Sequence, residues 1–362
     1  MVQELSFFSN QTTNLNSPHL RRWKKSINVS KIWKRTRDLI QSKTPAPLLN
    51  YLSRKYFKIG KTIEIRSKIA FLIHSPEMFV HYGPVFDHMD KDNIFLIAAG
   101  SEREKKKTFQ LSLDAEIECK DIHYLLRNGV RFETLVSNHA LYREYGLPAI
   151  DLLSIKNIRF MYSMGKSRHN FSSWNEKYSM FLVFGPTQAD QISSKFNGTV
   201  VQMGYPRYDR YFKEKPNLER LQARFKCDPG RKTIVWLPTW GKVSSIEDFS
   251  KLVSNLGQKY NVVVKTHPLT KIYEPDRVQL LNSLDFTNVI TGHLDNLLLY
   301  QLADLVLCDY GGPMFGAIYL NQNLALLDVK RAVNDRLLGN VSPEFEVRET
   351  LGSFDVENFN QI

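Results

Sequence analysis

Asp304-Leu-Val-Leu-Cys-Asp-Tyr-Gly-Gly-Pro-Met-Phe-Gly-Ala317 has the pattern of a short buried strand that runs into a Gly-Gly turn and then into a helix. Pro313 stands where proline is favoured, in the first turn of the expected helix. Glycine lets a backbone approach a ligand closely, and the unpaired N–H groups at a helix start attract anions. The segment predicts a diphosphate site at Gly311, Gly312 and Pro313, beside Asp309. An ordinary turn that needs glycine for its geometry is the alternative.

The same alternation of strand and helix extends along most of the chain. It predicts open parallel sheets in an α/β fold with two Rossmann-like domains, and a ligand between them at the carboxyl ends of the strands. A break at residues 227–230 separates the two series. Strands are expected at residues 69–74, 94–98, 134–137, 158–162, 180–184 and 199–203, and then at 233–237, 261–265, 288–290, 305–308 and 324–328.

Positive charge is concentrated near the N-terminus. Residues 1–70 hold 15 of the 49 Lys and Arg residues but only three of the 37 Asp and Glu residues, which accounts for the whole net charge of +12. Residues 19–41 mix Trp and Ile with Arg and Lys, as in a basic amphipathic helix. We expect residues 1–68 to be a basic helical segment, with residues 19–68 binding an anionic membrane surface. A solvated face packed on the next domain and, less readily, a nucleic-acid contact are the alternatives.

Composition excludes several protein classes. With 43% hydrophobic residues the chain can build a core, and no apolar run approaches the ~18 residues of a membrane span. The N-terminus lacks the pattern of a secretory signal, so we expect a cytoplasmic protein. The three cysteines lie far apart, which argues against a disulfide framework and a cysteine zinc site. Neither Asp90-Lys-Asp92 nor the histidines spaced from His74 to His88 suggest converging ligands, so we expect no metal.

Two further strand ends carry polar groups. Val262-Val-Val-Lys-Thr-His-Pro268 delivers His267 to the carboxyl end of a strand, where sites in α/β proteins are built. A histidine there can act as a general base or stabilise a phosphoryl group, and a structural histidine is the alternative. Thr239 follows the preceding strand of the same domain, where it donates to a phosphate or makes a local helix-side hydrogen bond.

A basic loop follows the strand expected at 158–162. It contains Lys166, Arg168 and His169, which suit a phosphate-rich ligand or an acceptor hydroxyl group. A solvated basic loop is the alternative.

Four short motifs occur together in one order. They are Gly204-Tyr-Pro-Arg-Tyr-Asp209, Leu237-Pro-Thr-Trp240, Lys265-Thr-His-Pro268 and Asp309-Tyr-Gly-Gly-Pro-Met-Phe-Gly-Ala317. In this order and spacing they resemble the CDP-glycerol glycerophosphotransferases of teichoic-acid and capsule synthesis. The resemblance extends over about residues 69–330.

The resemblance implies a GT-B-type fold, peripheral attachment to the inner face of the cell membrane, and metal-independent transfer of glycerol phosphate or ribitol phosphate. The donor would be CDP-linked, and the acceptor lipid-linked or a glycan. Residues 69–209 would form the acceptor side and residues 210–362 the donor side. His267 matches the family's histidine before proline, Gly311 and Gly312 its diphosphate-contacting residues, and Thr239 its Pro-Thr element.

We expect the acceptor hydroxyl to attack the donor phosphorus with CMP leaving. His267, with His169, would take the proton or stabilise the transferring group, while Lys166, Arg168 and Arg207 add positive charge.

The chain departs from the family at three places. Met164 stands where the family has a histidine, so His169 is the expected replacement. The serines of the Asp-Tyr-Ser-Ser element are Gly311 and Gly312, which leaves only backbone donors there. The helix that crosses back after the last strand is expected to be short or absent. These departures keep two alternatives open: a GT-B glycosyltransferase that uses a nucleotide sugar for capsule or lipopolysaccharide synthesis, and a binding protein without catalysis.

Overall fold

A computed structural model describes residues 64–141, 149–336, 338–339 and 342–362 of the chain. The expected basic helical segment falls outside these residues except at 64–68, which belong to a strand. The membrane contact expected of residues 19–68 therefore concerns a region almost entirely outside the described part. Among the described residues, no helix is both long and apolar enough to cross a bilayer.

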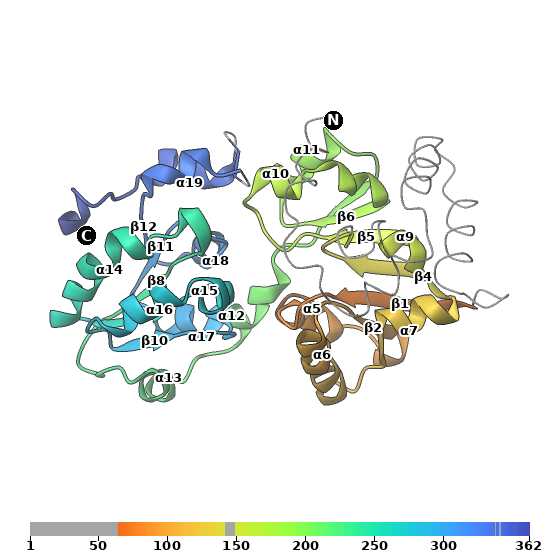
Figure 1. The fold of residues 1–362 in the computed structure, drawn as a ribbon, viewed down its shortest axis with the longest axis horizontal. Coiled ribbons are helices and arrows are strands. Elements are labelled where there is room, and N and C mark those ends of the chain that lie inside the picture. Colours follow the sequence, from red (N-terminus) through yellow and green to blue (C-terminus); the bar gives the residue numbers. More distant parts are fainter. Residues whose placement is uncertain (1–63, 142–148, 337, 340–341) are drawn as a thin grey trace, which may run out of the picture. The chain divides into compact units, whose positions relative to one another are not determined.

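The first sheet is parallel throughout and has seven strands in the order β3-β2-β1-β4-β5-β6-β7 (Figure 1). The order reverses between β1 and β4, which is where α/β proteins bind ligands. The strands are β1 (Glu64–Ile73), β2 (Ile94–Ala98), β3 (Cys119–Asp121), β4 (Val130–Ser137), β5 (Ser154–Phe160), β6 (Met180–Val183) and β7 (Thr199–Gln202).

Local sequence signals begin and end the helices between these strands. Ser101 and Glu104 form a capping box at one helix start, and Asp121 caps another that ends at Gly129 in the left-handed conformation. The helices are α5 (Met78–Phe86), α6 (Glu102–Asp114), α7 (Ile122–Asn128), α9 (Ala149–Leu153), α10 (Ser167–Asn170) and α11 (Pro186–Ser193). Single 3₁₀ turns lie at Lys91–Asn93 and Ser173–Lys177.

The second sheet has five parallel strands in the order β10-β9-β8-β11-β12. They are β8 (Thr233–Leu237), β9 (Asn261–Lys265), β10 (Asn288–Ile290), β11 (Leu305–Cys308) and β12 (Leu324–Leu326). The accompanying helices are α12 (Asp209–Lys213), α13 (Leu218–Phe225), α14 (Ile246–Asn255), α15 (Pro268–Tyr273), α16 (Pro275–Asn282), α17 (Asn296–Leu302), α18 (Pro313–Tyr319) and α19 (Pro343–Leu351). Further 3₁₀ turns lie at Pro206–Tyr208, Gly241–Val243, Leu256–Gln258, Lys330–Asn334 and Phe359–Gln361.

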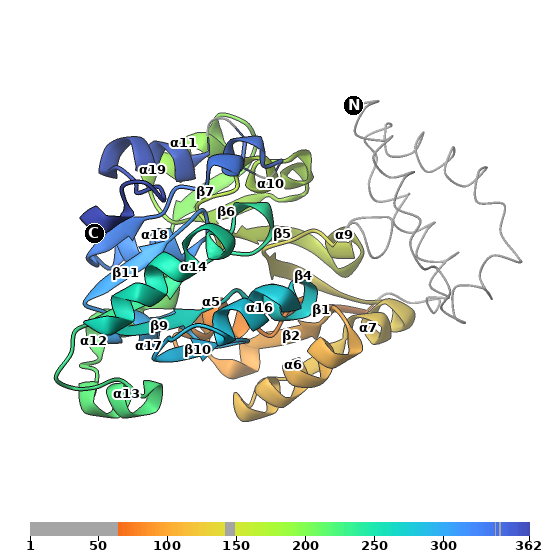
Figure 2. The ribbon, with the colours of Figure 1, turned by 60° about the vertical axis from the view of Figure 1, so that its left-hand side comes forward.

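Helices cover both faces of the second sheet (Figure 2). Trp236 and Val264 pack against α14 and α16, whereas Val235 and Val263 pack against α13, α17 and α18. Because both faces are buried, the central strands are apolar runs rather than alternating patterns. In the first sheet, α5 packs on β1, β2 and β4 in the same way.

The predicted strands agree with the structure most closely in the second sheet. β8, β9, β10 and β11 have the expected bounds, and β12 ends two residues before residue 328. The list of expected strands omitted β3, because a half-exposed Cys-Lys-Asp triplet has no apolar pattern.

The helix after the last strand, which was expected to be short or absent, is present as α19 and has nine residues. It reaches the loop after β5, where its Glu344 accepts a hydrogen bond from the backbone N–H of Lys166.

Candidate functional site

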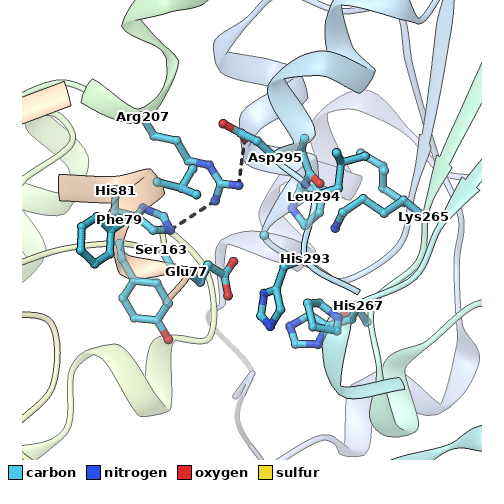
Figure 3. Close-up of a pocket in the computed structure, with 18 of the residues that line it drawn as sticks. Glu77, Phe79, His81, Ser163, Arg207, Lys265, His267, His293, Leu294 and Asp295 are labelled. Atoms are coloured by element: carbon cyan, nitrogen blue, oxygen red, sulfur yellow. Dashed lines mark hydrogen bonds and ion pairs between the residues drawn. The ribbon is translucent and has the colours of Figure 1, made fainter. Parts of the chain in front are cut away.

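A cavity of about 360 Å³ opens where segments that follow the strands of both sheets come together (Figure 3). Its walls come from the segments after β1, β5, β8, β9, β10 and β11, together with the Arg207 segment that links the two sheets. Six of the predicted site residues line it: Lys166, Arg207, Thr239, His267, Gly312 and Pro313. The four others, Arg168, His169, Asp309 and Gly311, are not among its lining residues.

Asp309 lies beneath the cavity wall. Its side chain is 0% exposed, and its carboxylate accepts hydrogen bonds from the backbone N–H groups of Thr239 and Ser245, each at 2.9 Å, and from the Ser245 hydroxyl. Burial raises the pKa of Asp309 to about 6, although these hydrogen bonds oppose the rise. Asp309 thus holds the Thr239 loop in place and does not face a ligand.

Gly311 is needed for the same packing. A Cβ atom at this position would lie 3.0 Å from Cβ of Thr239 and 3.2 Å from its Oγ1, so any side chain would push the Thr239 loop away. At Gly312 a Cβ atom would meet nothing within 4 Å. The two glycines therefore have different roles: Gly311 permits a close approach, and Gly312 leaves open space beside the cavity.

The two remaining predicted residues lie elsewhere. Arg168 is exposed, and its side chain packs beside Gly339, 3.0 Å from the position that a Cβ atom there would take. His169 stacks on His139 with ring centroids 5.8 Å apart, and both rings contact Trp174. The structure therefore places the expected replacement for the missing histidine in an aromatic cluster rather than on the cavity wall.

His267 caps the start of α15. Its Nδ1 accepts a hydrogen bond from the backbone N–H of Leu269 at 3.1 Å, and its ring stacks on Trp240. Burial lowers the pKa of His267 to about 4; Glu77 opposes this shift, and Lys166 adds to it. The ring is therefore neutral near pH 7. Since Nδ1 accepts, Nε2 carries the hydrogen, and the ring offers a ligand a hydrogen-bond donor.

Lys265, the last residue of β9, is a cavity residue that the prediction missed. Its side chain is 8% exposed, and it forms no ion pair with any described residue. Burial lowers its pKa to about 8, with Arg207 adding to the effect and Glu77 opposing it. An ammonium group without a carboxylate partner at a cavity wall is suited to an anion. Lys265 could have been predicted from the sequence because it ends a strand and lies two residues before His267.

Arg207 bridges groups that follow β1 and β10. Its Nη1 lies 3.2 Å from Nε2 of His81, and its Nη2 lies 3.4 Å from Oδ1 of Asp295 (Figure 3). A guanidinium group can only donate, so Nε2 of His81 accepts. Burial, reinforced by Arg207, lowers the pKa of His81 to about 3. Arg207 thus fixes the neutral form of His81 while it contributes positive charge to the cavity.

Glu77 is the second cavity residue that sequence reasoning missed. It immediately precedes α5, in the segment after β1, and its carboxylate points into the cavity (Figure 3). Burial alone would raise the pKa of Glu77, but the positive charge of Arg207, with a smaller contribution from Lys265, lowers it below its usual value. Its position in the segment after the apolar strand β1 was the signal that could have identified it.

Lys166 reaches the cavity from a constrained loop. Its backbone is left-handed, with φ 57°, and its N–H donates to Oε1 of Glu344 at 2.9 Å. Gly165 makes this approach possible, because a Cβ atom there would overlap the Glu344 carboxylate and lie 2.8 Å from the Phe315 ring. Gly165 and Glu344 have a structural role here, because together they determine where Lys166 lies.

No described group of three or more His, Cys, Asp or Glu side chains has the arrangement of a metal site. The cationic side chains that line the cavity are those of Lys107, Lys166, Arg207 and Lys265, and His267 adds a neutral donor. Their chemistry matches that of a phosphorylated ligand.

Comparisons with known proteins agree with this chemistry. The sequence profile of the family described as CDP-Glycerol:Poly(glycerophosphate) glycerophosphotransferase matches residues 153–323. No curated protein matches the chain by sequence.

Among solved structures, the chain is similar to the wall teichoic acid polymerase TagF, with a TM-score of 0.55 and 14% identity over 93% of this chain and 91% of that chain. A TagF variant soaked with CDPG for 15 minutes matches with a TM-score of 0.52 and 14% identity over 93% of this chain and 90% of that chain. The resemblance predicted from the motifs is confirmed: the chain matches the CDP-glycerol:poly(glycerophosphate) glycerophosphotransferase family over residues 153–323 and has the two-sheet, GT-B-type fold of TagF.

Proposed function

We propose that this protein transfers glycerol phosphate, or ribitol phosphate, from a CDP-linked donor to a lipid-linked or glycan acceptor in the synthesis of a cell-surface polymer. The observation that carries the proposal is the cavity, in which Lys166, Arg207 and Lys265 converge with His267 at the carboxyl ends of parallel strands. The family match over residues 153–323 supports the same reaction class.

The donor diphosphate is the ligand that these groups suit best. Arg207 and Lys265 are both largely buried and line the cavity, so their attraction for phosphate is weakly screened by water. Thr239 and Gly312 line the same region, and we assign the donor to this side, formed by residues 210–362. The acceptor then approaches from residues 69–209.

His267 stabilises charge in this reaction. When the acceptor oxygen bonds to the phosphorus of the transferred group, the bond from that phosphorus to the bridging oxygen of CMP breaks and negative charge grows on the departing phosphate. The Nε2–H of a neutral His267 donates a hydrogen bond there, and Lys265 adds positive charge. The hydrogen bond from Leu269 to Nδ1 holds the ring in the tautomer that this role requires.

The first test is a panel of donors. The purified chain is incubated with CDP-glycerol, CDP-ribitol, UDP-sugars or CMP-sugars and a poly(glycerol phosphate) acceptor, and nucleotide release and acceptor products are measured. CMP release with a new phosphodiester bond is expected with a CDP-alditol. A nucleoside diphosphate with a new glycosidic bond would instead assign glycosyl transfer. No turnover above a His267→Ala control with any donor would indicate a binding protein.

Membrane attachment needs a separate test, because residues 1–63 lie outside the described part. We propose that this basic segment holds the protein at the inner face of the membrane, close to lipid-linked acceptors. The full chain should sediment with vesicles that contain anionic lipid but not with neutral vesicles, and salt should release it. Equal binding to both vesicle types, or preferential retention by RNA, would contradict this.

A further inference from the structure

The cavity wall contains side chains of two kinds that could accept a proton from an acceptor hydroxyl group. The histidines are His81, His267 and His293, and the carboxylates are Glu77, Asp295 and Glu344. A general base must have a lone pair free to reach the hydroxyl group. The hydrogen bonds of the site show how far each of the six groups is already engaged.

Two of the histidines have no acceptor nitrogen to offer. Nε2 of His81 accepts from Arg207, and Nδ1 of His267 accepts from Leu269. In each neutral ring the second nitrogen therefore carries the hydrogen. The pKa values of the two rings, lowered by burial to about 3 and about 4, keep both rings neutral near pH 7. Both rings can donate, but neither can take a proton without losing its present hydrogen bond.

Two of the carboxylates are already engaged. Asp295 accepts from the backbone N–H of Leu297 at 3.1 Å and pairs with Arg207. Glu344 accepts from the backbone of Lys166 and from the Ser342 hydroxyl. These contacts bind Asp295, through Oδ1, to the start of α17 and to Arg207, and they bind Glu344 to the loop that positions Lys166. Both carboxylates thus stabilise the cavity wall.

Glu77 differs from both. Its carboxylate accepts no hydrogen bond and forms no ion pair with the described residues, although Arg207 and Lys265 lie close enough to favour its ionised form. It extends from the segment after β1, beside the point where the strand order reverses, and faces His293 and His267 across the cavity (Figure 3). His293, by contrast, is exposed to solvent in the loop after β10.

We propose that Glu77 is the catalytic base that takes the proton of the acceptor hydroxyl group. This inference rests on the proposed function. The acceptor O–H bond breaks as the proton passes to the Glu77 carboxylate, and the acceptor oxygen forms a bond to the phosphorus of the transferred alditol phosphate. The bond from that phosphorus to the CMP oxygen breaks, CMP leaves with the electron pair, and Glu77 then releases the proton to water. A carboxylate is sufficient because the transition state of phosphoryl transfer is loose.

The test compares Glu77→Gln with the wild-type chain and with Glu219→Gln, a control at an exposed position outside the cavity. Glu77→Gln keeps the size of the side chain, so the affinity for the alditol donor should change by no more than about threefold, while kcat falls by about 10²–10⁴-fold. Glu77→Asp should retain part of the activity. Formate, which can replace the missing carboxylate, should partly restore turnover to Glu77→Ala in a concentration-dependent manner. A purely structural role of Glu77 would not give this rescue.

The outcomes separate the two proposals. If the wild-type chain forms the phosphodiester and Glu77→Gln does so at a similar kcat, Glu77 is not the base and the proposed function stands. If the wild-type chain releases CMP from no alditol donor, both proposals fail. If the rate falls on the acidic side of neutrality and His293→Ala removes this fall, the proton passes to His293 and the assignment of Glu77 is overturned.

Discussion

The backbone N–H of Lys166 donates a hydrogen bond of 2.9 Å to Oε1 of Glu344, a residue 178 positions further along the chain. This bond connects the loop after β5 with α19. Glu344 is 1% exposed, and burial raises its pKa above the usual value although Ser342 and Lys166 donate to it. The position of a cavity lysine therefore depends on a buried carboxylate that follows the last strand.

Gly165→Ala should destabilise this connection. The added methyl group would overlap the Glu344 carboxylate and press on Phe315, so the hydrogen bond to Lys166 must break or the helix must shift. We expect the free energy of unfolding to fall by about 1–3 kcal/mol. Denaturant-induced unfolding of the variant and the wild-type chain measures this difference in the free energy of unfolding. The matched control is Gly185→Ala, because a Cβ atom on Gly185 meets nothing within 4 Å. Equal stability of the two variants would contradict the prediction.

Serine substitutions should distinguish the two glycines of the turn after β11. Gly311→Ser must push the Thr239 side chain aside, next to the backbone N–H that donates to Asp309, and should cost about 1–3 kcal/mol of stability. A side chain at Gly312 meets no atom within 4 Å of its Cβ, so the stability of Gly312→Ser should stay within about 0.5 kcal/mol of the wild-type value. A hydroxyl group there should strengthen donor binding by up to about tenfold. Thermal unfolding and calorimetric titration with CDP-glycerol measure both effects, and equal losses of stability would disprove the distinction.

His267→Asn should separate the structural role of His267 from its chemical role. Asparagine can keep an acceptor near the backbone N–H of Leu269 but lacks the Nε2–H donor. Transfer should therefore fall by about 10²–10³-fold while the protein remains folded. His267→Ala also loses the cap of α15, which should cost about 1 kcal/mol of stability in addition. Wild-type turnover by His267→Asn would remove the Nε2–H group from the mechanism.

Donor affinity should depend on the protonation of Lys265. The pKa of this ammonium group in the free protein is lowered to about 8 by burial. Lys265 is charged below that pH and attracts the diphosphate, whereas it loses its charge as the pH rises further. The dissociation constant for CDP-glycerol should be nearly constant below pH 8 and rise by up to about tenfold per pH unit above it.

Lys265→Arg provides the control for this pH dependence, because a guanidinium group stays charged throughout the range. Titrations between pH 6.5 and pH 9.5 should show no loss of affinity for this variant above pH ~8. A wild-type affinity that stays constant across the range would show that Lys265 does not contact the donor.

Much of the architecture was predictable because its signals are local. Apolar runs bounded by turn residues identified β8 to β11 with their observed bounds, and Pro313 marked the start of α18. β3 was missed because its half-exposed triplet gains its hydrogen-bonding partner only from β2, which lies more than twenty residues earlier. A strand at the edge of a sheet needs no apolar pattern of its own.

The predicted site residues also show the difference between local sequence signals and tertiary contacts. His267 and Thr239 line the cavity, and both were candidates because a strand end followed by proline or by a short loop can be recognised in the sequence. Asp309 and Gly311 were expected at the ligand, but the structure places both behind the cavity wall, where they position Thr239. A motif locates a residue near a site without showing which way its side chain points.

The sequence by itself determined most of the order of strands and helices, the family resemblance and the strand-end position of His267, because periodicity and turn chemistry depend on neighbouring residues. Only the tertiary structure decided that Glu77, Lys265 and Arg207 share one cavity with His267, and that His169 does not. These residues lie on elements far apart in the chain, so their distances depend on how two sheets pack. Their charge states follow from that packing, because burial and neighbouring ions set each pKa.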